Sequence, residues 1–149
     1  MPGNERHVVM NATSHSIQLE TEGNCDILDL TDSLQRVVEE SGVVRGQANA
    51  MVVGSTAALS TVEFEPGLVD DDIESALEDI APEDGHYEHE KTWGDDNGHS
   101  HVRATLLGPS LALPVVDGEI PFGTWQQPVL LDLDTRPRSR TVVVTVVGE

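Results

Sequence analysis

The segment at residues 141–147 constrains the fold of this chain more than any other, because its sequence, TVVVTVV, contains only β-branched residues. Two heavy atoms on Cβ restrict χ1 and favour the extended backbone of a β-strand. A lone strand leaves rows of unpaired N–H and C=O groups, so it needs neighbours. The sequence therefore predicts a β-sheet that contains this segment.

Two other segments have the spacing of helices. The first, within residues 29–46, begins at Thr31 or Asp32, whose side chains can accept from free amides, and ends at Gly42, which can adopt a left-handed conformation. The second lies within residues 69–82 and ends before Pro82. The apolar faces consist of Leu34, Val37 and Val38 in the first helix and Ile73, Leu77 and Ile80 in the second.

Further strands are predicted from alternation and from Val- and Thr-rich composition. Gly54 marks a bend, a bulge or the close approach of another group within the longest of them. The predicted strands lie at residues 14–22, 48–65, 99–107, 110–116, 128–134 and 141–147. The sequence contains no repeat or Pro/Ser-rich linker. It therefore predicts one compact α+β domain over residues 1–149, with a largely antiparallel sheet and two main helices.

The charge of the chain limits its partners. It has 27 Asp and Glu residues against eight Lys and Arg, and a net charge of −19 at pH 7. This charge repels a phosphate backbone, so no role with nucleic acid is expected. An acidic, Lys-poor surface suits a protein from a high-salt environment, because carboxylates hold water and salt screens their repulsion. The alternative is an acidic protein from ordinary salt.

Cysteine content and hydropathy indicate the compartment. The single cysteine, Cys25, excludes an internal disulfide and a cysteine-based zinc site. The N-terminus has no apolar h-region, and no apolar run approaches the roughly 18 residues of a membrane span. The expected location is the cytoplasm, with no membrane partner.

Nitrogen bases gather in the stretch WGDDNGHSHVRATLLGPS at residues 93–110. On a strand at residues 99–107, the side chains of His99, His101 and Arg103 would share one face. Two neutral imidazoles can bind one Zn²⁺ at about 2.0–2.1 Å. A third ligand would come from His89 or His86, or from the acidic pair at residues 95–96. The alternative is a solvated strand face without metal.

Other polar groups are candidates for substrate binding. Arg136, Arg138 and Arg140 would point to one side of an extended chain and could bind phosphate, although charges also protect strand edges from aggregation. Glu63 can bind Mg²⁺ or accept a proton, or it is plain surface. Trp125 can stack on a ring, although most tryptophans are packing residues.

These motifs, in this order, resemble the YjbQ-like family: WGDDNGHSHVRATLLGPS, then GTWQQ, then DLDTRPRSR before a Val-rich strand. Members carry the label "secondary thiamine-phosphate synthase". The resemblance implies a β-rich α+β homotrimer with a histidine cluster for a divalent metal near the subunit boundary. The characteristic polar positions of the family correspond to His89, Asn97, His99, His101, Arg103, Trp125, Gln126 and Arg138.

One motif departs from many bacterial members, which have His-Thr-Thr-Ala where this chain has Gly54-Ser55-Thr56-Ala57. Glu63 or Glu65 is the candidate to replace that histidine. The sequence at these positions resembles an archaeal branch of the family, which agrees with a salt-adapted composition.

The resemblance implies an enzyme that joins a pyrimidine diphosphate to a thiazole phosphate and releases pyrophosphate. We therefore expect a metal-dependent enzyme acting on phosphorylated small molecules, using zinc, or magnesium with pyrophosphate. The alternative is a trimeric metal- or ligand-binding protein without efficient catalysis. The expected site consists of His89, His99 and His101 for the metal, Glu63, Asn97 and Arg103 for catalysis, and Arg138, Arg140, Trp125 and Gln126 for the substrate.

Overall fold

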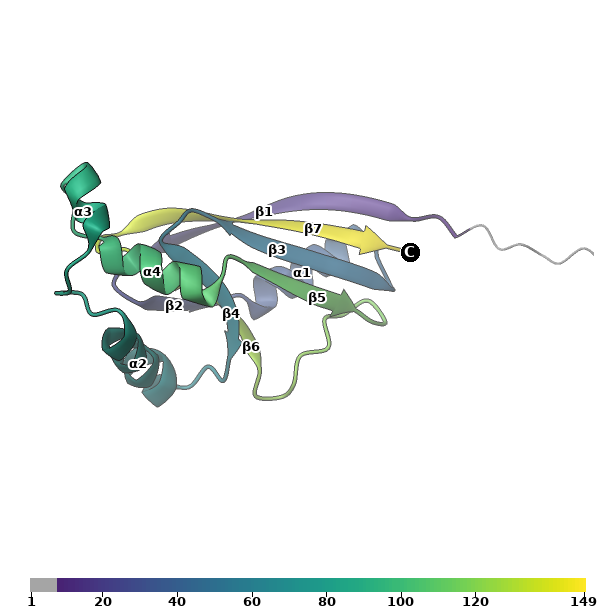
Figure 1. Ribbon diagram of the computed structural model, residues 1–149. Helices are drawn as coiled ribbons and strands as arrows, with labels where there is room; N and C mark the ends of the chain where they lie inside the picture. Colours follow the sequence, from purple (N-terminus) through teal and green to yellow (C-terminus); the bar gives the residue numbers. More distant parts are fainter. Residues whose placement is uncertain (1–7) are drawn as a thin grey trace, which may run out of the picture.

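The computed structural model describes residues 8–149, so residues 1–7 of the predicted domain, including His7, lie outside the described residues. The described chain forms two antiparallel sheets and four α-helices (Figure 1). This confirms the predicted α+β class, although the prediction of two main helices was too low. The four-stranded sheet has the order β1 (Asn11–Thr21), β7 (Arg138–Gly148), β3 (Gly46–Val53) and β5 (Ser110–Val115). The three-stranded sheet has the order β2 (Asp26–Asp29), β6 (Gln127–Asp132) and β4 (Ala57–Val62).

The β-branched segment is the central part of β7, which pairs with β1 on one side and β3 on the other. Val142, Val144 and Val146 are completely buried on one face of the sheet. The opposite face of β7 is half-buried or exposed. The β-sheet predicted from the seven β-branched residues is confirmed. The backbone groups on both edges of β7 pair with the neighbouring strands β1 and β3.

Gly54 ends β3, with φ at +138°. The predicted strand at 48–65 is in fact two strands, β3 and β4, which lie in different sheets. The predicted bend is confirmed. At this bend the chain leaves the four-stranded sheet and enters the three-stranded sheet. The two sheets are thereby joined at the end of the molecule where β7 begins.

Two apolar cores separate three layers. The first core lies between the two sheets and includes the buried stripe of α1 (Thr31–Ser41), which consists of Leu34, Val37 and Val38 as predicted. The second core lies between the three-stranded sheet and the helices α2 (Ile73–Ile80) and α4 (Gly98–Leu107). No helix covers the outer face of the four-stranded sheet within residues 8–149 (Figure 1).

The ends of α1 follow the predicted chemistry in part. Gly42 is in the left-handed conformation, with φ at +69°, and its N–H bonds to the carbonyl of Glu39. At the other end, Asp29 rather than Thr31 or Asp32 is the acceptor, because its Oδ1 receives the Thr31 N–H at 2.8 Å. The helix therefore starts where predicted, but the side chain that accepts from its first N–H lies two residues before Thr31, in the loop.

The second predicted helix begins as a π-helical segment, η1 (Gly67–Asp72), and continues as α2. Leu77 is buried as predicted, but Ile80 is 64% exposed. The predicted apolar face is therefore correct only over its first part. None of the helices within residues 8–149 is long and apolar enough to cross a membrane.

The predicted strand at residues 99–107 is wrong, because this segment is the helix α4. A further short helix, α3 (Glu88–Trp93), was not predicted. The buried positions of α4 include residues 99, 100, 103 and 104, which have the spacing of a helix face. Their side chains are His, Ser, Arg and Ala, so the buried stripe carries little hydrophobic signal. Because the buried face of this helix is mostly polar, the alternation of polar and apolar residues indicated a strand instead.

Candidate functional site

Five polar residues lie in the segment that runs from α3 into the first turn of α4, and we call them the histidine cluster: His89, Asp95, Asn97, His99 and His101. Gly94 ends α3 in the left-handed conformation, with φ at +68°, and its N–H bonds to the carbonyl of Glu90 at 2.7 Å. The chain turns sharply there and enters α4 at Gly98. This turn brings residues of α3 back against α4.

Three members of the cluster lie side by side. The ring centroids of His89 and His101 are 4.3 Å apart, with the rings tilted by 54°. The Nε2 atom of His89 lies 3.6 Å from Oδ2 of Asp95. The structure therefore places His89 beside His101.

His99 points elsewhere. Residues two apart on a helix are rotated by about 200°, so His99 and His101 do not share a face as the strand prediction required. The His99 side chain is completely buried, and its ring lies 6.2 Å from that of Tyr87. Burial, helped by the charge of Arg103, lowers the pKa of His99, so its imidazole is neutral near pH 7.

The histidine cluster is poorly satisfied in its hydrogen bonding. Among residues 8–149, the buried side-chain atoms without a hydrogen-bond partner are Nε2 of His89, Oδ1 of Asp95, Oδ1 of Asn97 and Nδ1 of His99. Buried polar atoms are nearly always paired in proteins, and each exception calls for a physical explanation. All four exceptions belong to one cluster, which is the property expected of a site that receives a ligand.

Arg103 lies beneath the cluster with its guanidinium buried. Its Nε donates to the carbonyl of Ala81 at 2.9 Å, and its Nη2 donates to Oε2 of Glu78 at 2.6 Å. A hydrogen bond from the Glu83 backbone, together with Arg103, lowers the pKa of Glu78. These contacts fasten α4 to the C-terminal end of α2, so Arg103 has a structural role in this chain.

The arginines of the C-terminal segment divide into two environments. Arg140 is buried and makes a bidentate pair with Asp132, from Nε at 2.6 Å and Nη2 at 2.9 Å. Arg138 remains 42% exposed, and its Nε donates to Oδ2 of Asp134 at 2.8 Å. The predicted phosphate-binding row therefore has one buried, neutralised member, Arg140, and two accessible members, Arg138 and Arg136, of which Arg136 is 57% exposed.

Asp132 and Asp134 were not predicted as important, yet they organise this region. Burial opposes their ionisation, but hydrogen bonds from Arg140 and Thr21 to Asp132 outweigh it, and its pKa falls. Bonds from the Thr135 backbone, Arg138 and Thr56 likewise lower the pKa of Asp134. The two aspartates are two residues apart, and so are Arg138 and Arg140. This equal spacing is the sequence signal that could have identified the two ion pairs.

The arginine segment contacts the turn of the histidine cluster. Oγ1 of Thr135 donates to Oδ1 of Asp96 at 3.0 Å, and Nη2 of Arg136 lies 3.5 Å from the same oxygen. Asp96 adjoins Asp95 of the cluster. The structure thus brings the predicted metal-binding and phosphate-binding segments to one end of the molecule.

Glu63, Trp125 and Gln126 lie at the opposite end of the three-stranded sheet. Gln127 pairs with Val62 at the start of β6, whereas Asp132 ends that strand near Arg140. A strand of six residues spans about 17 Å. Gln126 donates to Thr61 at 3.2 Å, and Trp125 is 74% exposed. One chain alone therefore does not bring these three predicted residues to the histidine cluster.

The donor atoms of the cluster suit a metal ion in kind, since imidazole nitrogen and carboxylate oxygen are both ligands of Zn²⁺. Two ligands of a tetrahedral zinc ion are separated by about 3.4 Å, close to the spacing between His89 and Asp95. Within residues 8–149, however, no three His, Cys, Asp or Glu side chains are arranged to hold an ion. The described part of a single chain therefore does not bring three such ligands together.

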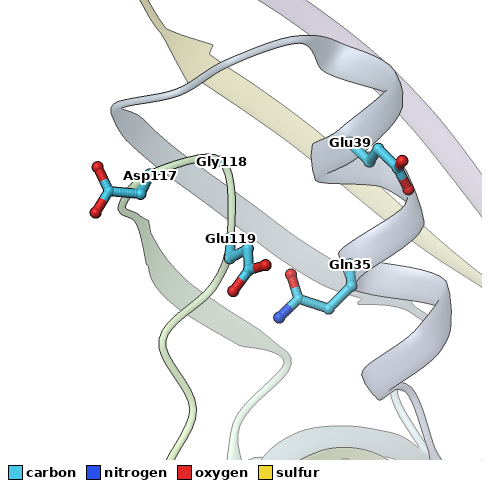
Figure 2. Close-up of a pocket in the computed structure, with 5 residues that line it drawn as sticks. All are labelled: Gln35, Glu39, Asp117, Gly118 and Glu119. Carbon is cyan, nitrogen blue, oxygen red and sulfur yellow. The ribbon is translucent and has the colours of Figure 1, made fainter.

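A separate cavity of about 480 Å³ lies between α1 and the loop after β5 (Figure 2). It is lined by Gln35, Glu39, Asp117, Gly118 and Glu119. Gln35 bonds to both the N–H and the carbonyl of Ile120, which fixes the loop. Three carboxylates at its wall would repel a phosphate, so this cavity does not suit a phosphorylated ligand.

Comparison with known proteins gives a consistent result. The sequence model of the YjbQ family, described as UPF0047 protein YjbQ-like, matches residues 15–149. A UPF0047 protein of Methanothermobacter thermautotrophicus is 37% identical over 142 residues, which cover 95% of this chain and 96% of that protein.

Solved structures agree. The crystal structure of a YbjQ-like protein of unknown function from Sulfolobus solfataricus P2 has a TM-score of 0.89 and 33% identity, covering 95% of this chain and all of that one. A YjbQ/UPF0047 family protein from Clostridium acetobutylicum has a TM-score of 0.80 and 28% identity, covering 89% of this chain and 98% of that one.

Proposed function

This chain belongs to the YjbQ-like UPF0047 family, and within that family we propose that it is a metal-dependent enzyme acting on phosphorylated small molecules. The observation that carries the proposal is the set of four buried polar atoms without partners, all in the histidine cluster. A bound divalent ion would satisfy the nitrogen and carboxylate atoms among them.

Zinc is the first candidate, because the cluster offers imidazole together with carboxylate. His89 and Asp95 would hold the ion, and His101 lies against His89. His99 and Asn97 would orient these ligands or hold bound water from the buried side of the cluster. An ion held by these residues would supply positive charge to stabilise a leaving pyrophosphate. Magnesium is the alternative where pyrophosphate supplies the oxygen ligands.

Arg138 is the proposed phosphate-binding residue. Within the described residues, its guanidinium uses only Nε in hydrogen bonds, so its two Nη groups are available to bind a phosphate. Arg140 supports it indirectly, since the Arg140 pair with Asp132 fixes the start of β7. The named reaction for this site is the joining of a pyrimidine diphosphate to a thiazole phosphate with release of pyrophosphate.

The remaining substrate residues require a second subunit. Glu63, Trp125 and Gln126 lie about one strand length from the cluster in a single chain, so we propose that a homotrimer brings them to the cluster of a neighbour. Their separation also favours the second candidate function, a trimeric metal- or ligand-binding protein without efficient catalysis.

Metal content tests the site. Purified protein is loaded with Zn²⁺, dialysed, and analysed for metal per chain at pH 7.5. The His89→Ala and His101→Ala variants should each lose most of the ion, while the control His86→Ala should keep it, because His86 is exposed and contacts Glu88 outside the cluster. His99→Ala should be less stable than His101→Ala, because only His99 is completely buried. Equal metal in the wild type and the His89→Ala/His101→Ala double variant contradicts the metal site.

Turnover separates the two candidate functions. The wild type is assayed for pyrophosphate release from the two phosphorylated substrates with and without metal. Metal-dependent release that Arg138→Gln weakens through a higher KM supports the enzyme. Saturable ligand binding without product supports the binding protein.

A further inference from the structure

Another cavity, of about 280 Å³, lies between the bend that ends β3 and the helix α4, and we call it the Gly54 cavity. It is lined by Gly54, Ser55, Ala57, Ala104, Thr105 and Pro109. Ala57 and Ala104 are buried and form its floor. Ser55 and Thr105 are exposed and lie at its mouth. The Gly54 cavity is therefore small, with an apolar floor and a polar rim.

Backbone hydrogen bonds hold the walls of the Gly54 cavity together. The Val52 N–H, in β3, donates to the carbonyl of Pro109 at 2.9 Å. The Leu59 N–H, in β4, donates to the carbonyl of Gly108 at 3.1 Å. The connection that follows α4 is thus bonded to the strands on both sides of the bend. The bend keeps a fixed position relative to α4, so the cavity is formed before any ligand binds, as ligand pockets usually are.

The guanidinium of Arg140 lies beside Gly54. A Cβ on residue 54 would lie 2.8 Å from Nη1 of Arg140, so the guanidinium reaches this position because glycine has no side chain. Nε and Nη2 donate to Asp132 and Thr56, but Nη1 donates to no atom of the described residues. Nη1 is not one of the completely buried atoms without a partner in residues 8–149, so it keeps access to solvent. A side chain that is only 7% exposed therefore presents two unused N–H donors beside a residue that lines the cavity.

The surroundings of Nη1 favour an uncharged acceptor. The charge of Arg140 is already balanced by its bidentate pair with Asp132, which is completely buried. A negatively charged group beside Nη1 would also lie near that carboxylate, and its burial would cost free energy. A ring nitrogen or a carbonyl oxygen can accept the same hydrogen bonds without that cost. The two alanines of the floor suit the apolar faces of a ring that carries such an atom.

We propose that the Gly54 cavity binds the uncharged, nitrogen-containing ring of a phosphorylated substrate, with a ring nitrogen or carbonyl oxygen facing Nη1 of Arg140. Arg138 and Arg140 are two residues apart on β7, so their Cα atoms are about 7 Å apart. A single ring with its phosphate on a one-carbon arm spans a comparable distance. The cavity lies just below the usual range of roughly 300–1,000 Å³ for ligand pockets, which suits one ring. This inference rests on the proposed function, because it takes Arg138 as the phosphate-binding residue.

The binding of isolated rings tests the cavity without metal or turnover. The probe is 4-aminopyrimidine at pH 8, where the ring is uncharged. It is titrated at millimolar concentration into metal-free, ¹⁵N-labelled protein in high salt, and the NMR signals of the Gly54 and Thr105 amides report its binding. Aniline has the same shape but no ring nitrogen, so it leaves Nη1 without an acceptor and should bind about tenfold or more weakly.

A larger side chain at the mouth should close the cavity. Thr105→Phe should raise the dissociation constant for 4-aminopyrimidine about tenfold or more, and Thr105 is exposed, so the fold tolerates the change. The matched control is Leu106→Phe, because Leu106 is the next residue of α4, is 61% exposed and lies outside the cavity. Circular dichroism checks folding, and Ser55→Leu, at the other exposed position of the mouth, replaces Thr105→Phe if that variant fails to fold. A wild type that does not bind the ring at these amides, equal binding of aniline, or unchanged ring binding by the folded mouth variant overturns the proposal.

Metal-dependent pyrophosphate release, measured on the same proteins, tests the proposed function separately. Ring binding in the cavity of a protein without turnover supports the cavity and contradicts the enzyme. Turnover that the folded Thr105→Phe variant retains with an unchanged KM contradicts the cavity and supports the enzyme. Arg138→Gln should weaken the binding of the phosphate ester of the ring but not of 4-aminopyrimidine itself, because Arg138 would contact only the phosphate.

Discussion

The buried pair of Arg140 and Asp132 provides a quantitative test of the structure. Their side chains are 7% and 0% exposed, and two hydrogen bonds join them. The substitution Arg140→Gln removes the positive charge and leaves the Asp132 carboxylate buried. The free energy of unfolding should therefore fall by much more than for a surface ion pair.

The magnitude follows from what remains around Asp132. Removing one partner of a buried pair costs about 3–5 kcal/mol, because the other charge is left uncompensated. Thr21 and the backbone N–H of Asp134 still donate to Asp132, so we expect the lower end of that range, about 3 kcal/mol. For a domain of this size, that corresponds to a fall in Tm of roughly 6–12 °C.

Urea unfolding at pH 7 and fixed high salt measures this loss. The control is Arg45→Gln, because Arg45 pairs with Glu149 at the surface with 72% of its side chain exposed. Exposed pairs contribute about 0–1 kcal/mol. If Arg140→Gln is no more destabilising than Arg45→Gln, the buried network described above is wrong.

Acid should reduce the difference in the free energy of unfolding between the wild type and Arg140→Gln. The pKa of Asp132 is lowered in the folded protein, so its contribution is fully present above the unfolded value of about 3.9 and is lost as the pH falls through the lower folded value. The stability gap should therefore be constant above about pH 5 and narrow below pH 4. Unfolding curves of both proteins at a series of pH values measure it.

Two further predictions concern the backbone at Gly54 and the charge of the surface. Gly54→Ala should cost about 1–3 kcal/mol in urea unfolding, because φ is +138° and the new Cβ would lie 2.8 Å from Nη1 of Arg140; Gly123→Ala, whose Cβ meets nothing closer than 3.6 Å, should cost less, and equal losses would contradict this reasoning. The Tm should fall when salt is reduced from about 1 M to 0.1 M, because the screening length grows from about 3 to 10 Å and the 27 carboxylates repel each other more strongly; an unchanged Tm would argue against salt adaptation.

The sequence was informative where burial is apolar. The β-branched run predicted β7, the stripe in α1 predicted its packing, and Gly54 predicted the break between β3 and β4. It was misleading in α4, because the buried face of that helix is made of His99, Ser100, Arg103 and Ala104. A hydrophobic pattern cannot reveal a helix that buries polar groups.

The sequence predicted which residues lie together in the candidate site better than it predicted how they are arranged. His89 and His101 do lie together, but through helices rather than through a shared strand face. Arg138 and Arg140 have different surroundings, because Asp132 and Asp134 come close only after the two sheets pack at this end. Such long-range pairs leave no periodic signal in the sequence.

A series of contacts connects the buried pair of Arg140 and Asp132 to the histidine cluster. Asp132 is anchored by Arg140 at the end of β6, and the chain then runs through Asp134 to Thr135, which donates to Asp96 in the turn before α4. That turn carries Asp95 toward His89. Since each contact fixes the next, the spacing of the cluster depends on the carboxylate–guanidinium network that joins the two sheets. A chain with so many carboxylates thus uses two of its few arginines to hold two of them inside, where they position the turn before α4.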